Sequence, residues 1–559
     1  MHRFAGHTGL KSTALLVVSV VIYLVLAGWI ARTKAPWCDE GAFANPAYNL
    51  AFHGYMGSNV LEPSGHYLNA YLQGIRERTY DVVPNHLVAL SGWFRVFGFS
   101  LFKMRAYSIC WGAAILLTFF YLLRRLFPDP WVAPLASLLM AVDFVIQWTT
   151  ADGRMEAPAC ALALGSLAAW LFFRERDLST AVLVSQFLAA AAVFTHPNAL
   201  IILLAVFVLA WRDDRKRFQL KHLLLASLPY FIFAELWSTY ILQNTSDFAA
   251  QFFANAAGRG SSRWKMILQP WRAIYFEAAR HFGNYRASGL WAGVMNPWMI
   301  TIPLIYLAAM VGFLRKRRQY SASTQAFLLC TVIVVLGMTF LNGLKAPAYL
   351  LYAVPFYDAV LAVWLLHLWK GGLHLRPVAG ALTAAFVAIQ LTTSIQHIRA
   401  DEYGREYLPA VQVVKNECAA GKSIVGTAAL GFGAGFQGFA DDWRLGLYSG
   451  LKPDVIVLDR SYREFTRRFE TDEPLVFSHV LTTLTSDYRL SARYGTFWIF
   501  ERVPAAQGKP APWLDTSGIG LKEKGKQAEY LFEQLALSPT TQGSTETATK
   551  TTHHDSRDY

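Results

Sequence analysis

Repeated long apolar runs constrain the fold of this chain more than any other feature of its sequence. A run of about 17–25 apolar residues is the length of an α-helix that crosses the hydrocarbon layer of a bilayer. Of the 559 residues, 54% are hydrophobic and only 16% are charged, which is little charge for a soluble protein of this length. The sequence therefore predicts a polytopic α-helical membrane protein. We expect about eleven spans, at residues 12–30, 106–123, 131–148, 157–173, 181–194, 199–211, 223–242, 297–314, 327–341, 349–369 and 378–395.

Basic residues predict the orientation of these spans. Clusters of Lys and Arg fall in every second loop, at Arg124, Arg174, Arg212, Arg315 and Lys370. Cytoplasmic loops carry an excess of Lys and Arg, so all five clusters are cytoplasmic if the N-terminus is cytoplasmic. Topology then explains the net charge of +13, and nucleic-acid binding is rejected because no basic stripe marks a soluble domain. The long loop 32–105 and the C-terminal part are expected on the outer face, with a short interfacial helix at 86–99.

The chain changes character near residue 399. A helix-like stretch at 409–419 precedes strand-like runs at 423–430 and 454–458, and 488–503 reads as a hairpin. We expect a transmembrane catalytic domain over 1–398, a small extracytoplasmic α/β domain over 399–505, and a low-complexity, largely disordered tail over 506–559. The glycine-rich stretch 431–435 lacks the Lys-Ser/Thr ending of a phosphate loop and is interpreted as a flexible loop.

Four polar groups fall on the predicted outer face: Asp39-Glu40, the segment 152–156, His196 and Lys345. Each alone has an ordinary explanation as a helix cap, a turn residue or a lysine that reaches the interface. Together they favour a functional site, because polar groups near membrane depth are functional by default. The combination suits transfer of a group from a lipid phosphate, in which a carboxylate deprotonates the acceptor hydroxyl and cationic groups stabilise the departing phosphate.

The order of several motifs along the first 400 residues is more specific. They are Asp39-Glu40, then Trp93-Phe94 with Phe97-Gly98, Ser100, Phe102 and Arg105, then Arg124-Arg125, then Arg154-Met155-Glu156, and last Lys345 with Pro347, Tyr349, Leu351 and Pro355. This set resembles the GT-C superfamily of membrane glycosyltransferases, in particular the branch of the protein O-mannosyltransferases and lipid A aminoarabinose transferases. Many bacterial members of that branch also carry an outer α/β domain at the C-terminus.

The resemblance implies an inverting transfer of a sugar from a polyprenyl-phosphate donor to a hydroxyl, without a nucleotide. Asp39 would be the general base, and Glu40 and Glu156 would orient the acceptor or a neighbouring cation. A divalent cation between Asp39 and Glu156 is permitted but not required. The substrate-binding residues expected from the resemblance and from their place on the outer face are His86, Lys103, Arg105, Asp152, Arg154, His196, Lys345 and Tyr349.

The chain also departs from the family pattern. Val83-Pro84 stands where the family often has Lys-Pro-Pro, His196 stands at a Lys position, and Glu156 replaces the commoner Asp. These changes leave the sugar open, and the acceptor could be a lipid, a glycan or a protein. The Trp-Trp-Asp motif of oligosaccharyltransferases is absent from the sequence.

Two alternatives to an enzyme stay open at this point: a transporter or flippase for lipid-linked sugars, and a catalytically inactive scaffold of the same fold. Carboxylates of a transporter would lie near the middle of a helix, whereas those singled out here lie at helix ends. The expected location is the cytoplasmic (inner) membrane of a bacterium, because the resembling branch with this tail domain is mostly prokaryotic. Whether Cys38 and Cys418, both on the predicted outer face, form a disulfide is left open.

Overall fold

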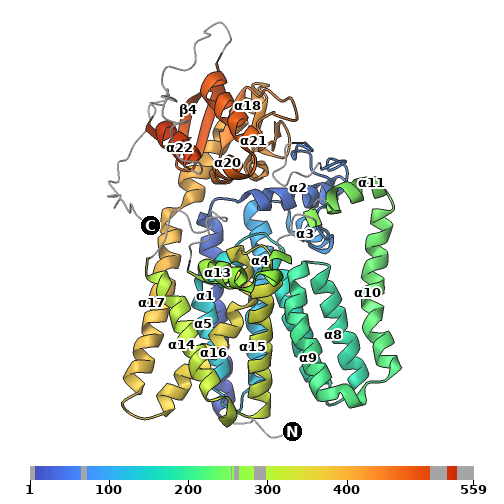
Figure 1. The fold of residues 1–559 in the computed structure, drawn as a ribbon, viewed down its shortest axis with the longest axis vertical. Helices are drawn as coiled ribbons and strands as arrows, with labels where there is room; N and C mark the ends of the chain where they lie inside the picture. Colours follow the sequence, from blue (N-terminus) through green and yellow to red (C-terminus); the bar gives the residue numbers. More distant parts are fainter. Residues whose placement is uncertain are drawn as a thin grey trace.

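A bundle of long helices forms the larger part of the molecule, and the C-terminal domain lies over one end of it (Figure 1). The structure, a computed structural model, describes residues 7–64, 72–253, 255–256, 264–282, 297–503 and 526–537. Seven described helices are long and apolar enough to cross a membrane. They are α1 (His7–Thr33), α4 (Leu101–Leu126), α7 (Glu156–Phe173), α10 (Leu220–Ile241), α14 (Thr301–Arg315) with the turn that precedes it from Trp298, α15 (Ala322–Phe340) and α17 (Arg376–Ala400). An eighth span results if α5 (Val132–Val142) and α6 (Phe144–Thr150), which meet at 61°, count as one.

Three shorter apolar helices complete the bundle. They are α8 (Leu178–Val193), α9 (Leu200–Asp214) and α16 (Val354–Lys370). α8 packs against α7 and α10, α9 against α15, and α16 against α5 and α14. Every predicted span overlaps one of these helices or the bent pair, so the polytopic helical class is confirmed. Among the described residues, seven spans, or eight with the bent pair, rather than eleven, meet the criterion of length and composition.

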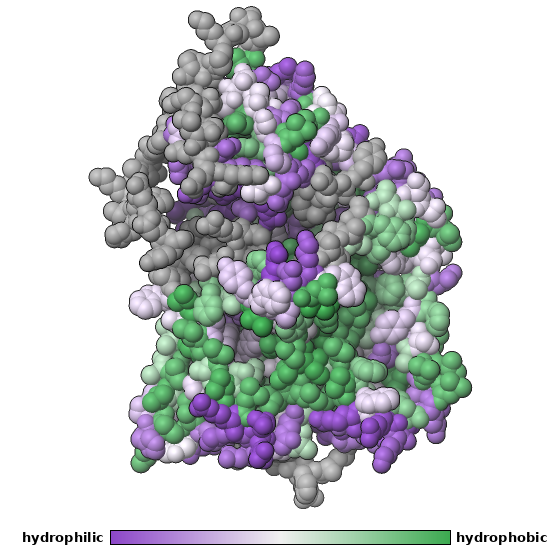
Figure 2. Space-filling view, viewed as in Figure 1, coloured by the Kyte–Doolittle hydropathy of each residue, from purple (hydrophilic) through white to green (hydrophobic). Residues whose placement is uncertain are grey.

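The predicted basic clusters lie on one face of the bundle. Ion pairs join loops that are far apart in the sequence: Arg125 to Glu175 at 2.6 Å, Arg174 to Asp213 at 2.7 Å, and Lys370 to Asp129 at 2.6 Å. Figure 2 shows a hydrophilic band at the end of the bundle opposite the C-terminal domain, below a broad hydrophobic belt. The alternation of basic loops predicted from the sequence is therefore present in the fold.

Two helices of the first outer loop lie between the bundle and the C-terminal domain: α2 (Cys38–Phe52) and α3 (Asn85–Phe97). α3 matches the predicted interfacial helix. α2 was not predicted, because Asp39 and Glu40 were interpreted as loop residues. They form instead the first turn of α2, where Glu40 accepts a hydrogen bond at 3.0 Å from the backbone N–H of Trp37. Carboxylates in the first turn are favoured by the helix dipole. Further short helices on this side are α11 (Thr245–Phe248) and α13 (Pro270–His281).

The C-terminal domain is built on a mixed sheet with the strand order β2-β1-β3-β5-β4. Its strands are β1 (Ile424–Gly426), β2 (Phe439–Ala440), β3 (Val455–Leu458), β4 (Tyr488–Tyr494) and β5 (Phe497–Arg502). β1 runs parallel to β2 and β3, whereas β5 runs antiparallel to β3 and β4. Its helices are α18 (Leu408–Ala419), α19 (Gly431–Ala434), α20 (Arg460–Asp472) and α21 (Pro474–Thr482). The predicted α/β character is present, but the glycine-rich stretch forms α19 instead of a loop.

The first outer loop and the C-terminal domain share one hydrophobic core. Phe99 stacks on Phe432 with ring centroids 5.7 Å apart, and Leu61 forms a parallel bridge with Asp441. The backbones also approach closely at Gly41 of α2, where an added Cβ would lie 2.2 Å from the carbonyl carbon of Ala428. The domain is therefore fixed on α2, directly beside the Asp39 turn.

Part of the predicted disordered tail is ordered. Residues 527–537 form α22 (Gln527–Leu537), whose apolar side is buried against the C-terminal domain through Leu531, Phe532 and Leu535. Its first backbone N–H groups donate to the carboxylate of Glu470. The remaining tail lies outside the described residues. Cys38 and Cys418 are both free thiols, so the structure contains no disulfide between them.

Candidate active site

A row of charged side chains joins the N-terminus of α2 to the N-terminus of α7. Arg154, in the connection between α6 and α7, donates to Asp39 through one terminal nitrogen of its guanidinium. The other terminal nitrogen donates to Glu156 at 2.6 Å, and Nε donates to both oxygens of Glu156 at 3.1 and 3.2 Å. The guanidinium also lies 4.5 Å over the ring of Trp37. Arg154, predicted in one motif with Glu156, thus contacts both Glu156 and Asp39, which belongs to another motif.

The carboxylates differ in access to solvent. The side chain of Asp39 is 29% exposed, whereas those of Glu40, Asp152 and Glu156 are completely buried. A soluble or lipid-borne hydroxyl can therefore reach Asp39 but none of the other three without a rearrangement.

Glu40 and Arg105 form a second, fully enclosed ion pair behind the first. Arg105 donates to Glu40 at 2.7 and 2.8 Å, and its remaining donors bind the backbone carbonyls of Ala31, Lys34 and Ala35. The backbone N–H of Gly153 also donates to Glu40 at 3.1 Å. These contacts occupy both side chains. The structure thus does not place Glu40 where it can touch an acceptor, nor Arg105 where it can touch a phosphate, and both hold the ends of α1, α2 and the Gly153 turn together.

Asp152 and His86 are also turned into the protein. Asp152 pairs with Lys34, whose ammonium lies 3.8 Å over the ring of Trp148. Burial raises the pKa of Asp152, against the effect of Lys34. His86 contacts the carbonyl of Gly153 at 3.2 Å, and burial lowers its pKa to about 4. A neutral, enclosed imidazole does not act as a cationic phosphate ligand, so the expectation for His86 does not agree with the geometry.

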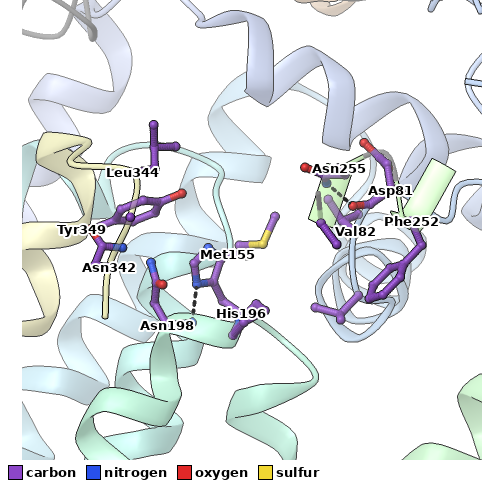
Figure 3. Close-up of a pocket in the computed structure, with 14 residues that line it drawn as sticks. Asp81, Val82, Met155, His196, Asn198, Phe252, Asn255, Asn342, Leu344 and Tyr349 are labelled. Carbon is purple, nitrogen blue, oxygen red and sulfur yellow. Dashed lines mark hydrogen bonds between the residues drawn. The ribbon is translucent and has the colours of Figure 1, made fainter. Parts of the chain in front are cut away.

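A pocket of about 190 Å³ opens beside this row (Figure 3). Met155, next to Arg154, lines it together with His196 and Tyr349, two of the predicted residues. Figure 3 shows Tyr349, Asn342 and Asn198 on one side of the pocket and Asp81, Val82 and Asn255 on the other. The imidazole of His196 accepts from the backbone N–H of Asn198 at 3.1 Å and packs against Tyr349, with ring centroids 5.4 Å apart. The described lining residues include no Lys or Arg.

Lys345 lies behind this pocket and not in its lining. Its ammonium donates at 2.6 Å to the carbonyls of Met338 and Thr339 at the end of α15 and pairs with Glu277 at 3.0 Å. Burial lowers the pKa of Lys345 to about 8, although Glu277 acts in the opposite direction. Lys103 is not in the lining either: it stands in the first turn of α4, and its ammonium lies over Gly98.

The residues of this region that were not predicted include two charged ones. Glu277 and Arg280 of α13 form an ion pair, and Arg280 donates to Asn342 of the pocket at 3.3 Å. Their spacing of three residues, with both side chains on one face of a helix, was the available signal. It was missed because the surrounding polar loop was not interpreted as helical.

The donor set between Asp39 and Glu156 does not fit a metal ion as it stands. Both carboxylates bind the guanidinium of Arg154, which supplies the positive charge that a divalent cation would bring. In the part of the chain that the structure describes, no three His, Cys, Asp or Glu side chains form a group that could hold a metal.

Comparisons with known proteins address the fold and the family. Residues 81–238 match the family model described as dolichyl-phosphate-mannose-protein mannosyltransferase. No curated protein sequence matches the chain significantly. Among solved structures, ArnT from Cupriavidus metallidurans bound to undecaprenyl phosphate is similar at a TM-score of 0.53 and 12% identity, covering 90% of this chain and 100% of that one.

A second similar structure is the archaeal oligosaccharyltransferase AglB from Archaeoglobus fulgidus, in complex with an inhibitory peptide and a dolichol-phosphate. It has a TM-score of 0.51 at 11% identity and covers 90% of this chain and 75% of AglB. At such identities these likenesses concern the fold. The family match over residues 81–238 and the shared fold agree with the resemblance of the sequence motifs to GT-C membrane glycosyltransferases.

Proposed function

We propose that this protein is an inverting glycosyltransferase that moves a sugar from a polyprenyl-phosphate donor to a hydroxyl group on the extracytoplasmic side of the cytoplasmic membrane. The observation that carries the proposal is the accessibility of Asp39: it is 29% exposed within a row of carboxylates that are otherwise buried. The structures of ArnT and AglB, which contain undecaprenyl phosphate and a dolichol-phosphate, support the class of donor.

Asp39 acts as the general base in this proposal. It takes the proton of the acceptor hydroxyl while the acceptor oxygen bonds to the anomeric carbon from the face opposite the phosphate. The bond between the anomeric carbon and the phosphate oxygen breaks, and the phosphate leaves with the electron pair. Attack from the opposite face inverts the configuration at the anomeric carbon.

The contacts of Arg154 set the charge around Asp39. One guanidinium is shared by two carboxylates, so Asp39, Arg154 and Glu156 carry a net charge of −1 when both acids are ionised. When Asp39 gains a proton, Arg154 keeps its bonds to Glu156 through Nε and a terminal nitrogen. Glu156 is therefore a positioning residue that keeps Arg154 in place through the proton transfer.

The donor headgroup occupies the pocket beside Met155 in this proposal. His196 and Tyr349, which line the pocket, contact the sugar phosphate, and Asn198 and Asn342 offer amide groups to sugar hydroxyls. Lys345 acts indirectly. It holds the segment 342–349 in place through its hydrogen bonds to the end of α15 and its ion pair with Glu277. The proposal includes no divalent cation, because the guanidinium of Arg154 stands between the two carboxylates and offsets one of their two charges.

The experiment uses purified protein in liposomes with a panel of polyprenyl-phosphate sugars and separate hydroxyl acceptors. We expect a new glycosidic bond of inverted configuration with the wild type and its loss with Asp39→Asn. Asp129→Asn is the matched control, because Asp129 also forms an ion pair but lies among the basic loops at the opposite end. Movement of the donor across the bilayer without a new bond would contradict the proposal and support a flippase.

A further inference from the structure

Two aspartates are enclosed in the helical bundle, away from the row around Asp39. Asp143 stands at the break between α5 and α6, and Asp358 lies in α16; both are fully buried. Tyr306 of α14 lies between them, with its hydroxyl 3.0 Å from Oδ2 of Asp143 and 2.8 Å from Oδ1 of Asp358. Ionisable residues at such depth are expensive and mark functional sites by default.

If both aspartates were ionised, the site would have too few hydrogens for its two hydrogen bonds at Tyr306. A tyrosine hydroxyl has one hydrogen and can donate to one oxygen at a time. If both aspartates were ionised, one contact of Tyr306 would bring two unprotonated oxygens together in a buried site. Among the described residues, no Lys or Arg pairs with either carboxylate to offset that charge. The group therefore needs one more hydrogen.

The contacts of the two acids show where this hydrogen belongs. Asp143 accepts from the backbone N–H of Ile146 at 3.1 Å and from the amide of Gln390 at 2.6 Å, in addition to Tyr306. Three donors stabilise a carboxylate. Asp358 has only Tyr306, and its Oδ2 has no hydrogen-bond partner among the residues that the structure describes. Asp143 is thus the ionised acid and Asp358 the neutral one.

We infer that Asp143, Tyr306 and Asp358 form an intramembrane proton-binding site that holds one exchangeable proton at neutral pH. Asp358 donates this proton to the oxygen of Tyr306, and Tyr306 donates its own hydrogen to Asp143. If each hydrogen shifts along its hydrogen bond toward Asp143, Asp143 becomes the neutral acid and Asp358 the ionised one. The net charge of the site does not change.

Other titratable groups near the site come from the surrounding helices. The ring of His397 in α17 lies 4.9 Å from Phe144, Tyr357 in α16 lies 5.3 Å from Tyr306, and His281 in α13 lies 5.7 Å from Tyr357, all as ring centroids. Among the described residues, Asp143 contacts Tyr306, Gln390 and the backbone N–H of Ile146, and Asp358 contacts Tyr306. α6 begins directly after Asp143 and ends two residues before Asp152, so the proton site and the acidic connection near Arg154 lie at opposite ends of one short helix.

Infrared difference spectroscopy of the purified protein in lipid nanodiscs at neutral pH tests the inference. An Asp→Asn change removes a carboxylic acid band if the acid is protonated and a carboxylate band if it is ionised. We expect Asp358→Asn to remove an acid band and Asp143→Asn to remove a carboxylate band. Asp129→Asn is the control and should remove a carboxylate band, because Asp129 is partly exposed and paired with Lys370.

Tyr306→Phe provides a second measurement if an aspartate variant does not fold. It should keep the acid band but shift it to higher frequency, because the neutral acid loses its hydrogen-bond partner. Loss of a carboxylate band in Asp358→Asn would overturn the inference. A thermal stabilisation of the wild type by Na⁺ that Asp358→Asn abolishes would also overturn it, because a metal cation and not a proton would then occupy the site.

Discussion

Replacement of Arg105 by Met should be one of the most destabilising single changes at the start of α4. The side chains of Arg105 and Glu40 are both 0% exposed, and the guanidinium makes two hydrogen bonds to Glu40 and three to backbone carbonyls at the end of α1. Removal of one partner leaves the charge of Glu40 buried and unpaired, which costs about 3–5 kcal/mol. Because total stability is commonly about 5–15 kcal/mol, this is a large fraction of it.

The assay is equilibrium unfolding in mild detergent, with the free energy of unfolding compared among variants. Arg76→Met is the matched control: Arg76 pairs with Glu62 in the first outer loop, but its side chain is 61% exposed. An exposed pair is worth about 0–1 kcal/mol. The double variant Arg105→Met with Glu40→Leu should recover much of the loss, because an apolar pair replaces the buried charges. A loss for Arg105→Met no larger than that for Arg76→Met would refute the reasoning.

Three further changes probe the domain contact and the pocket. Burial raises the pKa of Asp441 from 3.8 to about 8, so its contribution to stability is complete below pH 3.8 and is lost as the pH rises through about 8. Asp441→Asn should remove this slope from thermal melts, and an unchanged slope would contradict it. Gly41→Val should detach the C-terminal domain from α2 and increase its proteolysis, because the new Cβ would overlap the backbone of Ala428, whereas Gly28→Val, which meets nothing within 4 Å, should not. His196→Ala should raise the KM for the donor about tenfold, the effect of about 1.4 kcal/mol, with kcat less affected; a change in kcat alone would argue against donor binding.

The sequence predicted the spans because the length and apolarity of a membrane helix are set by the bilayer itself. It did not predict α2, because this helix is only weakly apolar and contains Pro46, and its start depends on the contact of Glu40 with Trp37. α22 was missed for another reason. Its buried residues Ala528, Leu531, Phe532 and Leu535 follow the helical spacing of three and four residues, but they lie within a tail whose composition indicated disorder.

The sequence named several residues of the candidate site, but it did not show which of them are paired and buried. Of the residues named from the motifs, Asp39 and Glu156 both contact Arg154, and His196 and Tyr349 line one pocket. The same motifs could not distinguish an accessible charged side chain from one that is buried and already paired. Arg105 and Glu40 were therefore expected at the substrate, although they bind each other. Burial and pairing depend on residues far apart in the chain, which a single sequence does not reveal.

Asp143 and Asp358 were overlooked because each is a single acid inside a long apolar run. The runs 131–148 and 349–369 were interpreted by their mean character, and the distance between the two acids is set by helix packing. The sequence argument against a transporter considers only carboxylates at helix ends. Asp143 and Asp358 lie inside the bundle, so they are the acids most relevant to that alternative.

The most direct test of the central claim is the rate of sugar transfer by Asp39→Asn at saturating donor, with donor affinity measured separately on the same preparation. General-base catalysis contributes about 10²–10⁴-fold to a rate. The account predicts a loss of that size with unchanged donor affinity, while Asp129→Asn transfers at the wild-type rate. Transfer by Asp39→Asn at the wild-type rate would contradict it.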